Sequence, residues 1–335
     1  MRVTQKDIAR RLGVSTSLVS RVLSGTAESI GANPGTIARI RKEAEALGYA
    51  PSAAARQLRG RGPGLIGVVA ADLEDPFFGP LAAEVARQAH AAGFALTLVG
   101  VDRRVPDPSD IHALLQYHLE GLLILGGGPN AWVAPFLERR IRVVRIGVGE
   151  GAPHIAQVAV DEIAGFAALI DHLIDKGHRD FAFVGADVPS HRRRRNLVRA
   201  LLRKRRLALP ASRAVLPDSD VLEAGARGGE KLVRANSDQW PTAIICSSDA
   251  VALGVLRSVA SVGWRVPDHV SVTGFDDLAL ARLSNPPLTS ARQPIDNMVA
   301  DALRMVREGA PTGVSRLHAP ILVVRGSTDF ACRTT

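Results

Sequence analysis

Residues 3–23, VTQKDIARRLGVSTSLVSRVL, constrain the fold of this chain more than any other stretch. They predict two short helices around a tight turn. Thr4 is suited to cap the first helix, and Asp7 three residues later completes a capping-box pattern. Gly13 can adopt the positive φ that ends a helix, and Ser15 can cap the next one.

The second of these helices has an apolar side and a polar side. The residues expected to face inward are Val19, Val22 and Leu23. Those expected to face outward are Thr16, Ser17, Ser20 and Arg21. A third helix is expected over residues 36–47. Three short helices with a polar, basic second helix are typical of a helix-turn-helix head, whose second helix enters a major groove. A helical hairpin on the surface is the alternative interpretation.

The positive charge of the chain is concentrated at its beginning. The net charge is +9, and residues 1–61 hold eleven basic and four acidic side chains, which leaves a nearly neutral body. Such a basic head suits binding to a phosphate backbone. The two cysteines, Cys246 and Cys332, have no metal-ligand spacing, so no metal site is expected. We expect a cytoplasmic protein, because neither a leader nor a long apolar span is visible.

After residue 64 the pattern changes to alternating strands and helices. Strands are expected at residues 65–71, 94–101, 121–127, 141–148, 181–186, 242–247 and 270–277. Helices are expected at residues 81–92, 111–118, 132–139, 163–176, 193–206, 225–235 and 250–262. This alternation predicts parallel, doubly wound sheets.

Three motifs carry a resemblance to a known family. They are T-x-x-D-I-A-x-x-L-G-V-S-x-S-x-V-S-R-V-L-S-G from residue 4, T-I-A-R-I from residue 36, and L-G-Y-A-P-S-A-A-A-R-Q-L from residue 47. The chain resembles the LacI-type (lactose repressor/GalR) family of bacterial transcription regulators over essentially its whole length. The resemblance implies a multi-domain protein, with an all-α helix-turn-helix head and an α/β periplasmic-binding-protein-like core of two doubly wound subdomains.

The resemblance also implies domain boundaries. The head is expected over residues 1–49, a hinge helix over 50–62, and the core over 63–335. Within the core, the N-subdomain would hold residues of about 63–160 and 290–320. The C-subdomain would hold about 161–289 and 321–335, with a ligand cleft between the two.

The expected DNA contacts come from the head and the hinge. Thr16, Ser17 and Arg21 are candidates for reading bases, with Arg21 suited to guanine. The candidates for binding phosphates are Lys6, Ser15 and Ser20. In the family, the hinge folds on operator DNA and a leucine enters the minor groove. Leu58 matches that leucine, and Ala55 and Arg56 of the same segment are expected to contact the DNA beside it. Without the resemblance, this segment would be interpreted as an inert linker.

Two effector-binding motifs are expected in the first half of the core and at its junction with the second. Asp72, Phe77 and Phe78 resemble the family's D-x-x-N-P-F-F, although core packing is the alternative for the aromatics. Asp161 resembles the V-D-N motif, with Glu162 in place of the asparagine. A helix N-cap is an additional interpretation of Asp161.

Three more motifs are expected in the second half. Ser190 and Arg193 resemble S-x-x-R-x-x-G, but Arg193 lies in a run of four arginines, so a solvated helix end is the alternative. If several of these arginines faced the cleft, an acidic effector such as a phosphorylated sugar would fit. Asp249 lies in a motif resembling A-N-D, and Asp276 in one resembling G-Y-D-D.

These features together predict a dimeric repressor that binds a near-palindromic operator and responds to a small molecule, expected to be a carbohydrate. The sequence leaves open whether that molecule is an inducer or a corepressor. A dimer is favoured over a tetramer, because no leucine heptad follows Leu322. No catalytic signature and no cofactor motif is visible. A stand-alone solute-binding protein and a sugar-modifying enzyme are the disfavoured alternatives.

Overall fold

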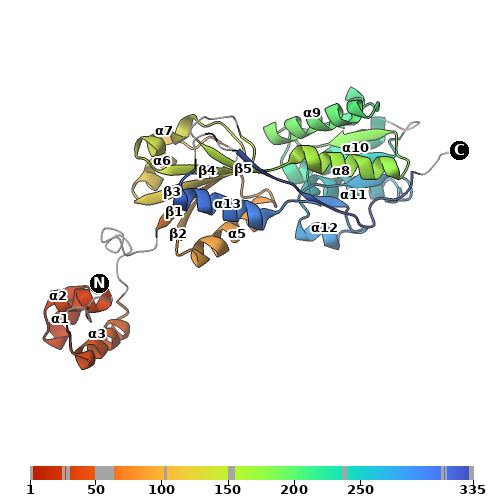
Figure 1. Ribbon diagram of the computed structural model, residues 1–335. Coiled ribbons are helices and arrows are strands. Elements are labelled where there is room, and N and C mark those ends of the chain that lie inside the picture. Colours follow the sequence, from red (N-terminus) through yellow and green to blue (C-terminus); the bar gives the residue numbers. More distant parts are fainter. Residues whose placement is uncertain are drawn as a thin grey trace. The chain divides into compact units, whose positions relative to one another are not determined.

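A computed structural model of the chain describes residues 3–24, 27, 31–49, 64–101, 104–149, 155–235, 240–310, 313 and 315–331. The chain divides into two compact units, a small one over Met1–Gly64 and a large one over Leu65–Thr335. Figure 1 labels the α-helices of both units and strands β1 to β5 of the large one.

The described residues of the small unit form three helices. They are α1 (Gln5–Leu12), α2 (Thr16–Leu23) and α3 (Pro34–Ala46). Ile8, Val19 and Ile40, one from each helix, are fully buried in one hydrophobic cluster. Burial of a branched apolar side chain from every helix holds the three together, at about 1.5–3 kcal/mol for each.

The turn between α1 and α2 has the geometry that the sequence predicts. Gly13 has a φ of 67° and ends α1. The Oγ of Ser15 accepts a hydrogen bond from the N–H of Leu18 at 3.1 Å. At the start of α1, the carboxylate of Asp7 accepts hydrogen bonds from the hydroxyl and the backbone N–H of Thr4, and these bonds lower the pKa of Asp7.

The first half of the large unit is a parallel sheet of six strands in the order β11-β5-β4-β3-β1-β2. The strands are β1 (Leu65–Ala70), β2 (Ala95–Gly100), β3 (Leu119–Leu125), β4 (Arg142–Ile146), β5 (Ala156–Val160) and β11 (Ser315–His318). The helices are α5 (Phe78–Ala91), α6 (Pro108–Leu115), η2 (Ala131–Val133), α7 (Ala134–Glu138) and α13 (Ile295–Glu308). Both faces are covered: Leu123 packs in the cluster that includes α5 and α13, whereas Leu122 packs in the cluster that includes α7.

The second half is a parallel sheet of four strands in the order β7-β6-β8-β9. The strands are β6 (Phe181–Val184), β7 (Ala214–Val215), β8 (Ala243–Cys246) and β9 (Ser271–Thr273). The helices are α8 (Glu162–Asp175), α9 (Pro189–Lys204), η3 (Ala211–Arg213), α10 (Val221–Ala235), α11 (Asp249–Ser261) and α12 (Ala279–Leu283). Helices α10 and α11 meet at two glycines, since a Cβ on Gly254 would lie 2.8 Å from the Cα of Gly225.

The chain passes between the two halves at three places. The first lies between β5 and α8, around Val160. The second follows β10 (Ser290–Arg292) and leads into α13. The third joins β11 to β12 (Ile321–Val323), which pairs antiparallel with β10.

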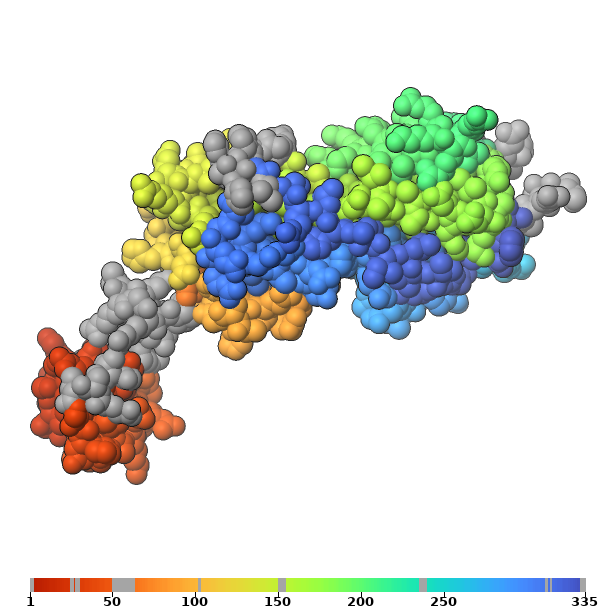
Figure 2. Space-filling view, viewed as in Figure 1, coloured from red at the N-terminus to blue at the C-terminus, as the bar shows by residue number. Residues whose placement is uncertain are grey.

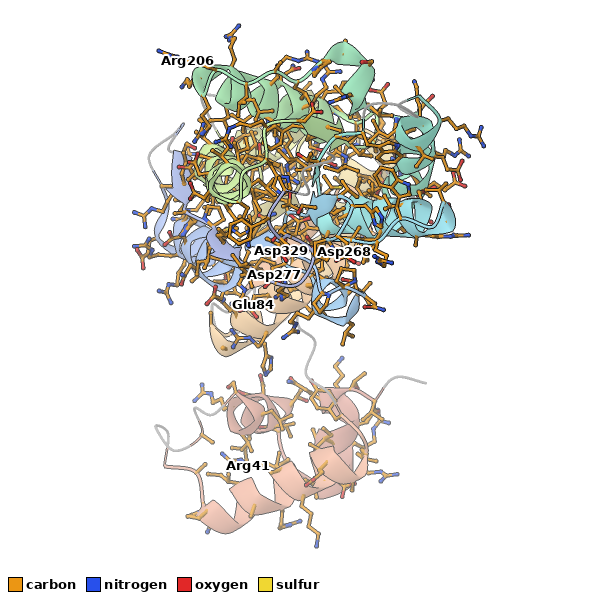
Figure 3. The ribbon with its side chains drawn as sticks, turned by 90° about the vertical axis from the view of Figure 1, so that its right-hand side faces the viewer. Arg41, Glu84, Arg206, Asp268, Asp277 and Asp329 are labelled. Atoms are coloured by element: carbon orange, nitrogen blue, oxygen red, sulfur yellow. The ribbon has the colours of Figure 1, made fainter. Side chains whose placement is uncertain are left out.

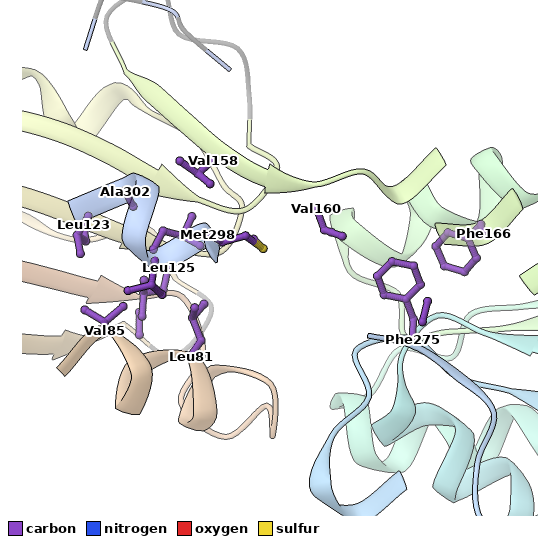
Figure 4. Close-up of a cluster of buried hydrophobic side chains, with 14 of the residues drawn as sticks. Leu81, Val85, Leu123, Leu125, Val158, Val160, Phe166, Phe275, Met298 and Ala302 are labelled. Atoms are coloured by element: carbon purple, nitrogen blue, oxygen red, sulfur yellow. The ribbon is translucent and has the colours of Figure 1, made fainter. Parts of the chain in front are cut away.

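One hydrophobic cluster continues across these connections. It runs from Leu81 and Leu125 in the first half to Phe166 and Phe275 in the second, with Val160 between them (Figure 4). In the space-filling view, the blue C-terminal segments cover parts of both halves (Figure 2). The two halves therefore share chain and core and form one unit.

Some helices differ from the sequence prediction. Helices α5, α9 and α10 begin at Phe78, Pro189 and Val221, three to four residues before the predicted starts at 81, 193 and 225. The first turn of α9, PSHR, has no apolar spacing that would mark it as helical. In α5 and α10 the apolar spacing does extend to the first residue, since Phe78 lies three positions before Leu81 and Val221 three positions before Ala224. Because α9 begins early, Ser190 and Arg193 lie inside its first turns. Helix α13 (Ile295–Glu308) was not among the predicted helices.

Helix length is limited throughout the described ranges. The longest helix, α9, has 16 residues and includes a run of arginines. No helix in these ranges is long and apolar enough to cross a membrane.

Candidate DNA-binding face and ligand cleft

The predicted DNA contacts of the small unit are accessible. The exposed ones are Lys6, Ser15, Thr16, Ser17 and Arg21, and Ser20 is half-buried. On the opposite side of α2, Val19 and Val22 are buried, so the helix presents its polar side to solvent. The hydroxyl of Ser15, whose oxygen accepts the cap bond, keeps its hydrogen for a further acceptor such as a phosphate.

The accessible surface around α2 and α3 is basic. Its exposed cations include Arg39, Arg41 and Lys42 on α3, and Arg10 is exposed on α1. Figure 3 labels Arg41 on the small unit. Arg11 forms an ion pair with Glu43 at 3.1 Å, which joins α1 to α3. The predicted hinge contacts Ala55, Arg56 and Leu58 lie outside the described residues.

The large unit contains a cavity of about 110 Å³ between its two halves. Five of the eight predicted effector contacts line it: Phe77, Phe78, Ser190, Arg193 and Asp276. Phe77 and Phe78 come from the first half. The other three come from α9 and from the loop after β9 in the second half. The position agrees with the general rule that ligands bind beyond the carboxyl ends of parallel strands.

A carboxylate that binds two arginines forms one wall of the cavity. Glu162, at the start of α8, accepts hydrogen bonds from Nε and Nη2 of Arg193 at 3.0 and 3.2 Å. It also accepts one from Nε of Arg194 at 2.7 Å. Burial of Glu162 raises the pKa of its carboxyl, but the charges and hydrogen bonds of Arg194 and Arg193 outweigh it, and the pKa is lowered.

Arg194 is itself held on several sides. Its Nη1 donates to the carbonyl of Ser247 at 2.7 Å and lies 3.9 Å from a carboxylate oxygen of Asp276. Its guanidinium lies over the ring of Phe275, 4.6 Å from the centroid. Phe275 stacks in turn on Phe166, with centroids 4.7 Å apart. The guanidinium is thereby fixed in place between the core and the cavity.

Asp276 lies on a strained turn. Its φ is 115°, a backbone conformation that side-chain-bearing residues rarely adopt. Its backbone N–H donates to the carbonyl of Ala291, and Nε2 of Gln293 donates to its Oδ1 at 2.6 Å. Burial raises the pKa of Asp276 well above its ordinary value, against the opposing charge of Arg194. The turn thus aims a carboxyl group of weakened acidity into the cavity.

His191 contributes a neutral donor. The backbone N–H of Ala186 donates to its Nδ1 at 3.0 Å. Burial, together with the charge of Arg194, lowers the pKa of His191 to about 3. The ring is therefore neutral near pH 7 and carries its proton on Nε2.

The first half supplies an apolar wall with one acid. The rings of Phe77 and Phe78 meet edge to face, with centroids 5.5 Å apart. Asp75 also lines the cavity, and one of its carboxylate oxygens accepts the N–H of Phe77 at 3.0 Å. Asp75 is close enough to act electrostatically on Asp276 and Arg194 across the cavity.

The three remaining predicted contacts do not line the cavity. Asp72 accepts backbone N–H groups of the turn that follows it. Asp161 caps α8 through the N–H of Ala164, which is the additional interpretation given above. Asp249 is fully buried and accepts the hydroxyl of Ser290. Burial of Asp249 raises its pKa to about 7.

Several cavity residues were not among the predicted contacts. They are Asp75, Glu162, His191, Arg194 and Gln293. Glu162 was visible only as a departure from a motif, and Arg194 only as one member of an arginine run. Asp75 lies within the quoted D-x-x-N-P-F-F stretch and could have been chosen from it. Among the described residues, no cluster of three or more His, Cys, Asp or Glu could hold a metal ion.

Comparisons with known proteins identify the family. A model of the periplasmic binding protein-like domain matches residues 170–328. Catabolite control protein A of Priestia megaterium is 30% identical over 91% of this chain and 92% of that protein. The crystal structure of a LacI transcriptional regulator from a Rhodococcus species is 30% identical, with a TM-score of 0.70, and covers 80% of this chain and 99% of that one. This chain belongs to the LacI family of transcriptional regulators.

Membership of the LacI family makes the chain a DNA-binding transcriptional regulator and not an enzyme. A crystal structure of the lac repressor dimer bound to operator and the anti-inducer ONPF has a TM-score of 0.83 against this chain. It is 23% identical and covers 98% of this chain and 100% of that one, so it shows the fold. The predicted fold class, a helix-turn-helix head with a periplasmic-binding-protein-like core, is confirmed.

Proposed function

We propose that this LacI-family regulator is a repressor that binds a near-palindromic operator as a homodimer. Its affinity for the operator falls or rises when a small molecule occupies the cleft. One observation carries the proposal: a single chain combines an exposed, polar α2 on a basic unit with a cavity lined by fixed polar groups. The operator-bound dimer of the lac repressor, which shares the fold, supports it.

On DNA, we assign different tasks to the exposed residues of α1 and α2. Thr16, Ser17 and Arg21 would contact base edges, because they lie on the exposed side of the helix that enters the groove. Lys6, Ser15 and Ser20 would bind phosphates and set the register. The hinge residues Ala55, Arg56 and Leu58 would enter the minor groove and bend the operator.

In the core, we propose that a carbohydrate-like effector contacts Phe77, Phe78, Ser190, Arg193 and Asp276. This scheme includes the predicted domains: a head over 1–49, a hinge over 50–62, and a core of two subdomains over 63–335. An effector changes DNA affinity only by favouring one arrangement of the subdomains over the other. The protein would act in the cytoplasm, on the nucleoid when bound to its operator.

The DNA-binding part is tested without knowledge of the operator. Selection of bound fragments from a random DNA library should enrich a near-palindromic sequence. Fluorescence anisotropy on the enriched sequence should then show tight, salt-dependent binding. Recovery of no common sequence, or of a single asymmetric half-site, would contradict the proposed dimeric mode.

The residue assignment is tested by Arg21→Ala. Loss of a guanine contact should remove about 1–3 kcal/mol of discrimination at one base pair of each half-site. Arg41→Ala, at an exposed cation of α3, serves as the matched control and should weaken all sequences alike. Equal weakening on all sequences by Arg21→Ala would reassign Arg21 to a phosphate.

The effector part is tested with the same selected DNA and a panel of neutral sugars, each with its phosphate. One compound should change operator affinity in the parent protein, and the sign of the change distinguishes an inducer from a corepressor. Asp276→Ala should abolish this response and leave operator affinity intact. An unchanged response would remove Asp276 from the site.

A further inference from the structure

Glu162 binds both arginines that face the cleft, and this arrangement bears on the chemistry of the ligand. We infer that Glu162 restricts the cleft to uncharged, hydroxyl-rich molecules and excludes phosphorylated or carboxylated ones. The inference rests on the proposed function in so far as it concerns the effector site of a regulator. It also answers the question that the arginine run raised, namely whether two arginines at the cleft imply an acidic effector.

The strongest anion-binding geometry of each arginine is already used within the protein. A carboxylate or phosphate prefers the fork formed by two neighbouring N–H groups of a guanidinium. In Arg193 this fork, Nε with Nη2, holds Glu162. In Arg194, Nε holds Glu162 and Nη1 holds the carbonyl of Ser247. An anionic ligand that used these same N–H groups would have to displace a carboxylate that is covalently part of the site.

The charges around the cavity are also close to balanced. Two guanidiniums face the carboxyl groups of Glu162, Asp75 and Asp276. The pKa of Asp276 is raised by burial, which favours its neutral form. A phosphate would add one or two negative charges beside Glu162 and Asp75. An ammonium group would meet the two guanidiniums, so a cationic ligand is disfavoured as well.

What remains for a ligand is a set of single donors and acceptors. Among the described contacts, no protein acceptor binds Nη1 of Arg193 or Nη2 of Arg194. Nε2 of His191 is a neutral donor, and Asp276 and Gln293 offer oxygen acceptors. Each of these groups matches one hydroxyl, which can donate and accept.

The apolar wall fits the same class of ligand. Phe77 and Phe78 give the cavity a hydrophobic side opposite the polar groups of the second half. A sugar ring presents hydroxyls at its edges and C–H groups on its faces. Aromatic rings bury such faces, while the opposite wall binds the hydroxyls.

The test compares anion binding in the parent protein and in Glu162→Gln. The probes are inorganic phosphate, glucose and glucose 6-phosphate, measured by isothermal titration calorimetry on the full-length protein at fixed ionic strength. The parent should bind inorganic phosphate no more tightly than the control variant Asp171→Asn does. It should also bind glucose 6-phosphate no more tightly than glucose. Glu162→Gln removes the negative charge that both guanidiniums bind and should gain at least about tenfold in affinity for phosphate.

Asp171→Asn is the matched control. Asp171 also lies on α8 and binds Nε and Nη2 of Arg205, which directly follows α9, but this pair lies outside the cavity. Its removal frees a guanidinium without opening the cleft and should give no comparable gain. Adding Arg193→Gln to Glu162→Gln should reverse the gain, which assigns the bound phosphate to the cleft.

Two outcomes would overturn the inference. One is a parent protein that binds glucose 6-phosphate about tenfold more tightly than glucose. The other is a folded Glu162→Gln variant without any gain for phosphate. If that variant does not fold, Glu162→Asn, which has the residue typical of the motif, is interpreted in the same way. Operator selection on the same preparations is an independent readout, so a failure of the proposed function is distinguishable from a failure of this inference.

Discussion

Replacement of Arg194 by methionine should destabilise the large unit substantially. Methionine keeps an apolar side chain over Phe275 but removes the bonds to Glu162 and to the carbonyl of Ser247, both 2.7 Å long. Breaking a buried ion pair costs about 3–5 kcal/mol. Because Glu162 keeps its two bonds from Arg193, we expect a loss of about 2–4 kcal/mol in the free energy of unfolding. In a unit of this size, that loss corresponds to a fall in Tm of about 4–7 °C.

Tryptophan fluorescence isolates this effect. The three tryptophans of the chain, Trp132, Trp240 and Trp264, all lie in the large unit, so urea unfolding followed by their emission does not report on the head. A double-mutant cycle of Arg194→Met with Glu162→Gln should give a coupling energy of about 1–3 kcal/mol.

The pair of Asp171 and Arg205 provides the reference cycle. The side chains of Arg194 and Glu162 are 11% and 9% exposed, whereas those of Arg205 and Asp171 are 23% and 54% exposed. The more exposed pair should therefore couple by no more than about 1 kcal/mol. Equal coupling in the two pairs, or an Arg194→Met loss below about 1 kcal/mol, would refute the view that burial makes the Glu162 pair strong.

Three further outcomes are expected. Asp249 has a pKa of about 7 in the folded chain, so its ionisation favours the unfolded state as pH rises from about 4 to 7. Urea unfolding of Asp249→Asn should show a smaller loss of stability over this range, and an unchanged pH slope would contradict the assignment. Gly254→Ala places a Cβ 2.5 Å from the N of Ala226 and should lower the free energy of unfolding by about 1–3 kcal/mol. The control Gly79→Ala, whose Cβ would have nothing within 4 Å, should be neutral or stabilising. Equal Tm values of the two variants would refute the close contact between α10 and α11. Ser15→Ala removes the cap of α2 and should speed hydrogen exchange in that helix about fivefold, and protection equal to the parent would show that the cap contributes nothing.

The local features of the head could be predicted because they depend on neighbouring residues. A cap at Ser15, a left-handed glycine at Gly13 and the inward face of Val19 need only a few positions to be recognised. The same holds for the alternating strands and helices of the core. Helix α13 also has a regular apolar pattern in the sequence, including Val299, Leu303 and Val306, so periodicity is sufficient to predict it.

The cleft could be predicted only in part. Phe77 and Phe78 follow the end of β1, and the turn that holds Asp276 follows the end of β9, so topology alone brings them toward one place. The partnership of Glu162 with Arg193 and Arg194 depends on how α8 aligns with α9, across more than thirty residues. Periodicity places each residue on its helix, but the relative position of two packed helices is set by the whole core.

The polar groups and the aromatic rings of the cleft come from different halves of the core. The polar groups of the cavity wall, namely Glu162, its two arginines, His191 and Asp276, all belong to the second half of the core. The groups that would distinguish one ligand from another are thus built into one half. The aromatic wall belongs to the other half, whose strand β1 continues the chain that leaves the head. A change of ligand preference can therefore evolve on the second half without rebuilding the half that adjoins the head in sequence.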